Sequence, residues 1–154
     1  MDSNEILLSL GTIPLLAYAI YWGGRPFTIG PDTLNYVKMF SDLIKEDYSL
    51  LSNVDNGFIT LIRISASISD NPSLFLTIIS LIQAACFYIV GVVFLKRSIY
   101  FYLYIFMLLT SPFYLSININ ILRHGISASV ALLGISIIYR MKGYFYRFVL
   151  AYIP

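Results

Sequence analysis

A polar stretch that carries one arginine and one histidine separates two apolar runs in the second half of the sequence. It covers residues 116–129, SININILRHGISAS, and contains Arg123 and His124. An arginine at the centre of a membrane helix costs about 2.5–3.5 kcal/mol, so an apolar chain tends to keep one where an anion or a partner needs it. The alternative is an arginine at the end of a span, which reaches the headgroups and only anchors the helix.

The chemistry that this stretch offers is recognition of an anion such as a pyrophosphate. The guanidinium of Arg123 is permanently charged and can bind two phosphate oxygens at once. Asn120 adds an amide that donates and accepts hydrogen bonds. His124 adds a titratable imidazole, for which a purely structural hydrogen-bonded role is the alternative. The chain has one His and one Cys and no nucleotide-binding motif, so we expect no metal site and no cofactor.

A second group of polar residues is expected on one helix face nearer the start of the chain. Asp32 stands in the segment Gly30-Pro31-Asp32-Thr33, and Tyr36 follows four positions later. This face could hydrogen-bond sugar hydroxyls, whereas the alternative for Asp32 is an N-cap whose carboxylate accepts from backbone N–H groups. Arg25 comes just after the first apolar run and is either a second phosphate contact or an interfacial anchor.

The composition predicts that membrane-spanning helices position these residues. The chain of 154 residues is 58% hydrophobic and only 12% charged, against about 25% charged in soluble domains. The fold class we expect is therefore all-α and polytopic, a single transmembrane domain. Apolar runs predict four complete spans and the start of a fifth, which is too short to cross: residues 6–22, 73–95, 99–115, 125–139 and 144–154. The short last run indicates a truncated chain or fragment, or else an interfacial tail.

Residues 25–72 form the one long polar region, with two short amphipathic helices expected along the membrane surface. The first opens at Pro31-Asp32-Thr33, and apolar residues recur in it at helical spacing: Leu34, Val37, Phe40 and Ile44. The second carries Phe58, Leu61, Ile62, Ser65 and Ile68. Aromatic residues near the ends of the apolar runs predict interfacial belts, among them Tyr21, Tyr100, Tyr114 and Tyr139.

The basic residues predict how the spans are oriented. Lys96 and Arg97 follow one span, and Arg140, Lys142 and Arg147 follow the span two further on, so both groups lie on the same side. The excess of Lys and Arg marks that side as cytoplasmic, which also places the N-terminus in the cytoplasm. Residues 25–72 and the stretch around Arg123 then both face the exterior, where they can meet.

The sequence resembles the EpsG-type, Wzy-like family of exopolysaccharide polymerases. Arg25 followed by GPDTLNY at residues 30–36 is similar to the family's R…G-T-D…Y signature, and Gly57-Phe58 opens the second outer helix. The segment NILRHGIS at residues 120–127 is similar to the family's N-x-x-R-Q-x-[IL]-A stretch, with His124 where Gln is usual. The resemblance covers essentially the whole chain, as the N-terminal part of a longer member.

This resemblance implies glycosyl transfer between undecaprenyl-pyrophosphate-linked oligosaccharide repeats, at the outer face of a bacterial cytoplasmic membrane. It implies that Arg123 stabilises the departing pyrophosphate and that Asp32 orients or deprotonates the acceptor hydroxyl. Arg25, Tyr36, Asn120 and His124 are the expected substrate contacts. The expected partners are the lipid-linked saccharide, the bilayer and other polysaccharide export proteins, and no nucleic acid.

Two other functions remain open from the residues. A transporter or flippase-like protein would move a lipid-linked sugar without making bonds, and it predicts ionisable groups inside the spans. The four complete expected spans contain none. A structural membrane subunit is the other alternative, in which Arg123 only anchors its helix.

Overall fold

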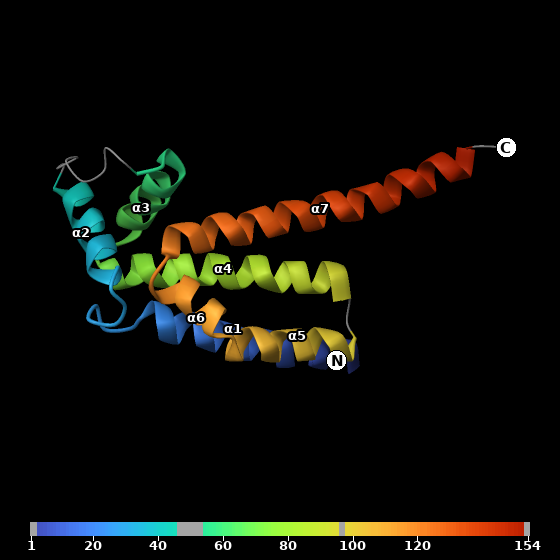
Figure 1. The fold of residues 1–154 in the computed structure, drawn as a ribbon, viewed down its shortest axis with the longest axis horizontal. Helices are drawn as coiled ribbons and strands as arrows, with labels where there is room; N and C mark the ends of the chain where they lie inside the picture. Colours follow the sequence, from blue (N-terminus) through green and yellow to red (C-terminus); the bar gives the residue numbers. More distant parts are fainter. Residues whose placement is uncertain (1–2, 46–53, 96–97, 153–154) are drawn as a thin grey trace.

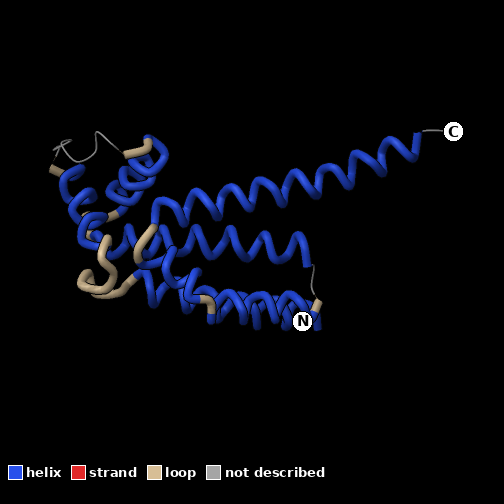
Figure 2. Tube along the Cα trace, in the orientation of Figure 1, coloured by secondary structure: helices blue, strands red, loops and turns tan. Residues whose placement is uncertain are grey.

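The computed structural model describes residues 3–45, 54–95 and 98–152, and the side chains of residues 11–45, 54–95 and 98–141. Every regular element in these ranges is an α-helix (Figure 2), as the composition predicts. The helices are α1 (Ser3–Gly23), α2 (Thr33–Ile44), α3 (Asn56–Ile68), α4 (Pro72–Leu95), α5 (Ile99–Thr110), α6 (Pro112–Ile119) and α7 (Leu122–Tyr152).

The molecule consists of a helix bundle with a small helical cap at one end (Figure 1). Helix α4 lies at the centre of the bundle and contacts α1, α2, α3, α5 and α7. The cap comprises residues 24–45 and 54–71, with α2 and α3, and it stands where α1 ends and α4 and α7 begin. The start of α1 and the end of α7 both lie toward the opposite end. The cap and the start of α7 thus share one end of the bundle, which confirms that residues 25–72 and the Arg123 stretch can meet.

Two helices are long and apolar enough to cross a membrane, α4 and residues 122–141 of α7. A third span is present if α5 and α6 are counted together, although they meet at an angle of 58°. These numbers refer to the part of the chain that the structure describes. The expected total of four complete spans and part of a fifth stays a prediction.

One helix runs through the boundary expected between the runs 125–139 and 144–154. Helix α7 begins at Leu122, three residues before the expected 125–139 span, and continues without a break to Tyr152. The run RMKGY at residues 140–144 contains no proline, and its single glycine costs only about 1 kcal/mol relative to alanine. The polar residues that suggested a boundary are therefore good enough helix formers to continue the same helix. Residues 153–154 lie outside those described.

The break expected at Pro112 is confirmed, and it changes the direction of the chain. Helix α5 ends at Thr110, and Pro112 occupies the first turn of α6, where its missing N–H costs no hydrogen bond. Ser111 caps α6 by accepting a 3.4 Å hydrogen bond from the N–H of Tyr114. The bend buries Tyr114 inside the bundle, which corrects its expected place in an aromatic belt, whereas Tyr21, Tyr100 and Tyr139 are exposed.

The cap is held by an aromatic core on the first turns of α4. The ring of Phe75 stacks on Phe40 of α2 at 5.4 Å and meets Phe58 of α3 edge-on at 5.9 Å. Both expected cap helices are present, but three residues of their expected apolar faces are exposed instead of buried: Leu34, Ile44 and Ile68. The helical spacing predicted that Leu34 would face the core, but Tyr36 is buried instead. The reason is that α2 directs its aromatic residues toward α3 and α4.

Candidate functional site

The structure brings all six candidate residues to the capped end of the bundle. Arg25 and Asp32 belong to the loop between α1 and α2, and Tyr36 lies in the first turn of α2. The remaining three follow at the junction of α6 and α7: Asn120, Arg123 and His124. Two far-apart stretches of sequence therefore form one candidate site.

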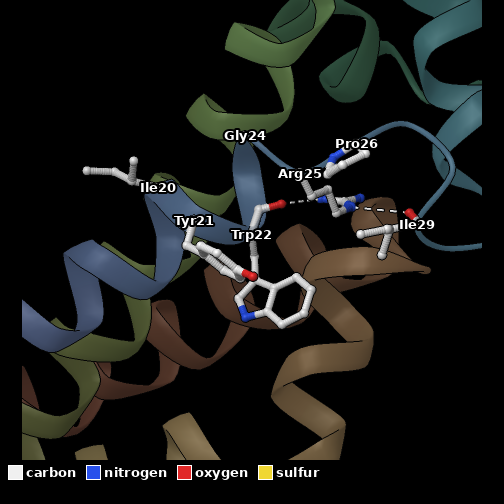
Figure 3. Close-up of a pocket in the computed structure, with 7 residues that line it drawn as sticks. All are labelled: Ile20, Tyr21, Trp22, Gly24, Arg25, Pro26 and Ile29. Carbon is white, nitrogen blue, oxygen red and sulfur yellow. Dashed lines mark hydrogen bonds between the residues drawn. The ribbon is translucent and has the colours of Figure 1, made fainter.

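Arg25 is buried, with only 3% of its surface exposed, and it binds other parts of the chain. Its guanidinium donates to the carbonyl of Trp22 at 2.7 Å, to Oγ1 of Thr33 at 2.9 Å and to the carbonyl of Ile119 at 3.0 Å. Figure 3 shows the side chain between α1 and the loop, beside a pocket of about 340 Å³ lined also by Trp22 and Pro26. Burial lowers the pKa of Arg25 to about 10, so the side chain keeps its charge at neutral pH.

These bonds make Arg25 a connection between three helices. Its partners lie at the end of α1, at the start of α2 and at the end of α6, 94 residues away. The sequence suggested a phosphate contact, but in this arrangement its donors are directed to the chain's own oxygens. Thr33, which is fully buried and also donates to the carbonyl of Ile29 at 2.7 Å, was not singled out from the sequence, although it belongs to the quoted motif.

Asn120 lies against the turn that leads into α2. Gly30 in that turn has a φ of +91°, a conformation that strongly favours glycine. An added Cβ there would collide with Cγ2 of Ile119 and lie 2.9 Å from Oδ1 of Asn120. That Oδ1 is buried and has no hydrogen-bond partner in the described part of the chain. Asn120 thus contributes to the fit between the two stretches.

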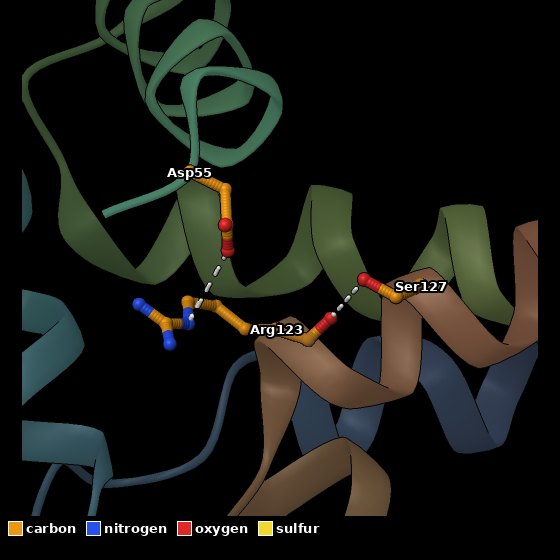
Figure 4. Close-up of polar contacts among 3 residues, drawn as sticks. All are labelled: Asp55, Arg123 and Ser127. Atoms are coloured by element: carbon orange, nitrogen blue, oxygen red, sulfur yellow. Dashed lines mark hydrogen bonds and ion pairs between the residues drawn. The ribbon is translucent and has the colours of Figure 1, made fainter. Parts of the chain in front are cut away.

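Arg123 is the accessible cation of the site. It lies in the first turn of α7, and 32% of its side-chain surface is exposed. Its Nε is 3.9 Å from a carboxylate oxygen of Asp55, whose side chain is 80% exposed (Figure 4). An exposed ion pair of this kind contributes about 0–1 kcal/mol, so an anion with more charge can displace Asp55. From the sequence Asp55 was only part of a turn, because its pairing with Arg123 depends on where the start of α3 lies in the fold.

Both Arg123 and Asp32 influence the pKa of Tyr36. Burial raises the pKa of the Tyr36 hydroxyl, and hydrogen bonding from the backbone of Arg123 lowers it in part. The charge of Asp32 raises the same pKa and that of Arg123 lowers it, so the hydroxyl lies close enough to feel both. The hydroxyl therefore stays protonated at neutral pH.

Asp32 and His124 occupy the two helix starts of the site. Asp32 stands at the N-cap position of α2, but its side chain makes no capping hydrogen bond. The N-cap role that was the alternative for its carboxylate is therefore not seen. His124 is exposed in the first turn of α7, next to Arg123.

The arrangement combines a cation with a helix N-terminus, where unpaired N–H groups add partial positive charge. A phosphate group is the natural ligand of such a combination. Asp32, at the N-cap position of α2, brings a carboxyl group to the same end of the bundle. Among the described residues no group of three His, Cys, Asp or Glu side chains is placed to hold a metal ion.

The family model of EpsG matches residues 9–153, nearly the whole chain. The chain belongs to the EpsG family. The resemblance seen in the motifs is thereby confirmed, and the match spans all six candidate residues. Together with its apolar helices, membership of the EpsG family makes this chain a membrane protein. No curated protein and no solved structure matches it.

Proposed function

We propose that this EpsG-family chain belongs to the catalytic part of a polysaccharide polymerase. In this proposal it joins oligosaccharide repeats carried on undecaprenyl pyrophosphate, at the outer face of a bacterial cytoplasmic membrane, with its N-terminus in the cytoplasm. The observation that carries the proposal is the position of Arg123, one third exposed at the start of α7, on the same end of the bundle as Asp32 and Tyr36.

The proposed reaction is a displacement at the anomeric carbon of the donor saccharide. The acceptor hydroxyl oxygen bonds to that carbon, and the bond from the carbon to the pyrophosphate oxygen breaks. The lipid pyrophosphate leaves with the bonding electrons, while Asp32 takes the proton of the acceptor hydroxyl. Charge develops on the leaving oxygen, where the guanidinium of Arg123 and the N-terminus of α7 stabilise it.

The other site residues support this reaction in different ways. Tyr36 is buried in the first turn of α2, and its pKa responds to the charge of Arg123, so we assign it a role in positioning Arg123. His124 is exposed beside Arg123 and can donate to a phosphate or a sugar hydroxyl. Arg25 and Asn120 hold the loop between α1 and α2 against the end of α6. The bilayer and other polysaccharide export proteins are the further partners that we propose.

The test is the length of the polysaccharide that cells make when the gene carries Arg123→Ala. We expect the variant to be present in the membrane at the normal level, while a polysaccharide gel shows single repeats, because the leaving group has lost its cation. Arg63→Ala is the control, since Arg63 is also an exposed arginine of the cap. Polymers of normal length from Arg123→Ala cells would refute the proposal.

A further inference from the structure

A second group of polar side chains lies inside the bundle, below the cap. It consists of Tyr18 in α1, Ser80 and Gln83 in α4, and Tyr114 and Asn118 in α6. Ser80, Gln83, Tyr114 and Asn118 are fully buried, and Tyr18 is partly buried. We call these five residues the polar seam. None of them belongs to the site around Arg123.

Each residue of the polar seam has a polar atom without a hydrogen-bond partner among the residues that the structure describes. These atoms are the hydroxyls of Tyr18, Ser80 and Tyr114 and the amide oxygens of Gln83 and Asn118. A buried polar group without a partner is unfavourable, and the more so in a membrane, where no water replaces the partner. Five such groups together indicate that something polar binds here.

Contacts connect Tyr18, Tyr114 and Asn118 to one another, and Gln83 to the start of α7. The rings of Tyr18 and Tyr114 stack with their centres 5.3 Å apart. The ring of Phe87, which lies one turn after Gln83 in α4, meets Tyr114 edge-on at 5.4 Å. Asn118 lies one turn after Tyr114 and donates to its carbonyl at 2.8 Å. Gln83 donates to the carbonyl of Leu122 at 3.3 Å, next to Arg123. The seam therefore reaches the start of α7.

The chemistry of the polar seam fits a ligand rich in hydroxyl groups. A hydroxyl both donates and accepts, so it satisfies the amide oxygens and the tyrosine hydroxyls alike. The stacked tyrosine rings add an apolar face of the kind that packs against the C–H face of a sugar. Water and saccharides both supply hydroxyl groups, but a saccharide also uses the rings.

Helix α6 is the element whose movement would open the polar seam. It has only eight residues, and a 58° bend at Ser111 separates it from α5. At its other end Asn120 and Ile121 interrupt the helical path before α7. Both joints are places where backbone angles can change without breaking a long helix.

We propose that the polar seam is a saccharide-binding subsite that opens when α6 moves away from α4. The polar seam binds hydroxyl groups of the saccharide repeat, and Arg123 binds the pyrophosphate of the same repeat. This inference rests on the proposed function. The ligand is placed beside Arg123 because Gln83 of the polar seam donates to the carbonyl of Leu122, the residue before Arg123.

Cysteine labelling tests whether the polar seam opens and what fills it. Asn118→Cys is made in a chain with Cys86→Ala, and Ile105→Cys, which is 4% exposed in the apolar core, is the matched control. The probe is a small methanethiosulfonate reagent, applied in vesicles of synthetic phosphatidylcholine and in native membranes that contain lipid-linked saccharides. We expect Asn118→Cys to react at least tenfold faster than the control in synthetic vesicles and several-fold slower in native membranes. A rate equal to the control, or the same rate in both membranes, would overturn the proposal.

A pair of tyrosine variants tests the same subsite without cysteines. The hydroxyl of Tyr104 donates to the carbonyl of Phe87 at 3.1 Å, whereas that of Tyr114 has no partner in the described chain. Tyr104→Phe should lower the melting midpoint and leave polymer length unchanged. Tyr114→Phe should keep the melting midpoint and shorten the polymer. Equal behaviour of the two variants would overturn the subsite, while short polymers from Arg123→Ala would still support the polymerase.

Discussion

Arg25 and Arg123 carry the same side chain, but the fold surrounds them differently. Arg25 is 3% exposed and donates to oxygens of three helices, whereas Arg123 is 32% exposed and faces one weakly held carboxylate. The sequence placed both near the membrane boundary but could not separate their roles. A partner of Arg25 lies 94 residues away, so its burial depends on tertiary contacts that no local pattern contains.

Arg25→Lys is expected to lower the free energy of unfolding by about 2–3 kcal/mol, although it keeps the positive charge. Lysine lacks the planar fork, so it cannot reach the carbonyls of Trp22 and Ile119 together with Thr33. Thermal or detergent denaturation of the purified chain measures the change. Arg63→Lys, at an exposed cap position, should stay within about 0.5 kcal/mol of the unchanged chain. An equally small effect at Arg25 would show that its bonds contribute little.

At the scale of elements, the sequence predicted starts and breaks better than it predicted burial. Pro31-Asp32-Thr33 marked the start of α2, and Pro112 marked the break before α6, because proline restricts the backbone locally. The exposed positions of Leu34 and Ile68 were missed, since the neighbours on α4 decide which face is buried. The continuity of α7 was missed because Arg140 and Lys142 resembled the end of a span.

The turn before α2 should depend strongly on Gly30. Gly30→Ala is expected to lower the free energy of unfolding by about 2 kcal/mol or more, since alanine is strained at a φ of +91° and its Cβ meets Ile119. Gly57→Ala in α3 is the matched control, because nothing lies within 4 Å of an added Cβ there. The control should be neutral or stabilising by up to about 1 kcal/mol. The same effect at both glycines would contradict the structural role of the turn.

At the scale of the whole molecule, the two polar stretches share one end of the bundle, as the order of spans predicted (Figure 1). This agreement arises because the number of helices between the two stretches fixes their relative side, whatever the details of packing. The cap packs on α4 through Phe75, a contact that the sequence did not indicate. The sequence prediction that the cap faces the exterior rests on the positive-inside rule.

Labelling of single cysteines in intact cells tests that orientation. In a chain with Cys86→Ala, Arg63→Cys lies on the cap and Tyr100→Cys at the first turn of α5, at the opposite end. We expect a membrane-impermeant maleimide to label Arg63→Cys at once and Tyr100→Cys only after permeabilisation, since the positive-inside rule puts the cap outside. The reverse pattern would place the cap in the cytoplasm.

The role of Arg123 can be measured as the affinity of the purified chain for undecaprenyl pyrophosphate in lipid nanodiscs. We predict that Arg123→Ala binds this lipid at least tenfold more weakly than the unchanged chain, a loss of about 1.4 kcal/mol, because a diphosphate needs the guanidinium. Arg63→Ala should bind as the unchanged chain does. Equal affinity of the Arg123→Ala chain and the unchanged chain would contradict the central claim that Arg123 holds the pyrophosphate.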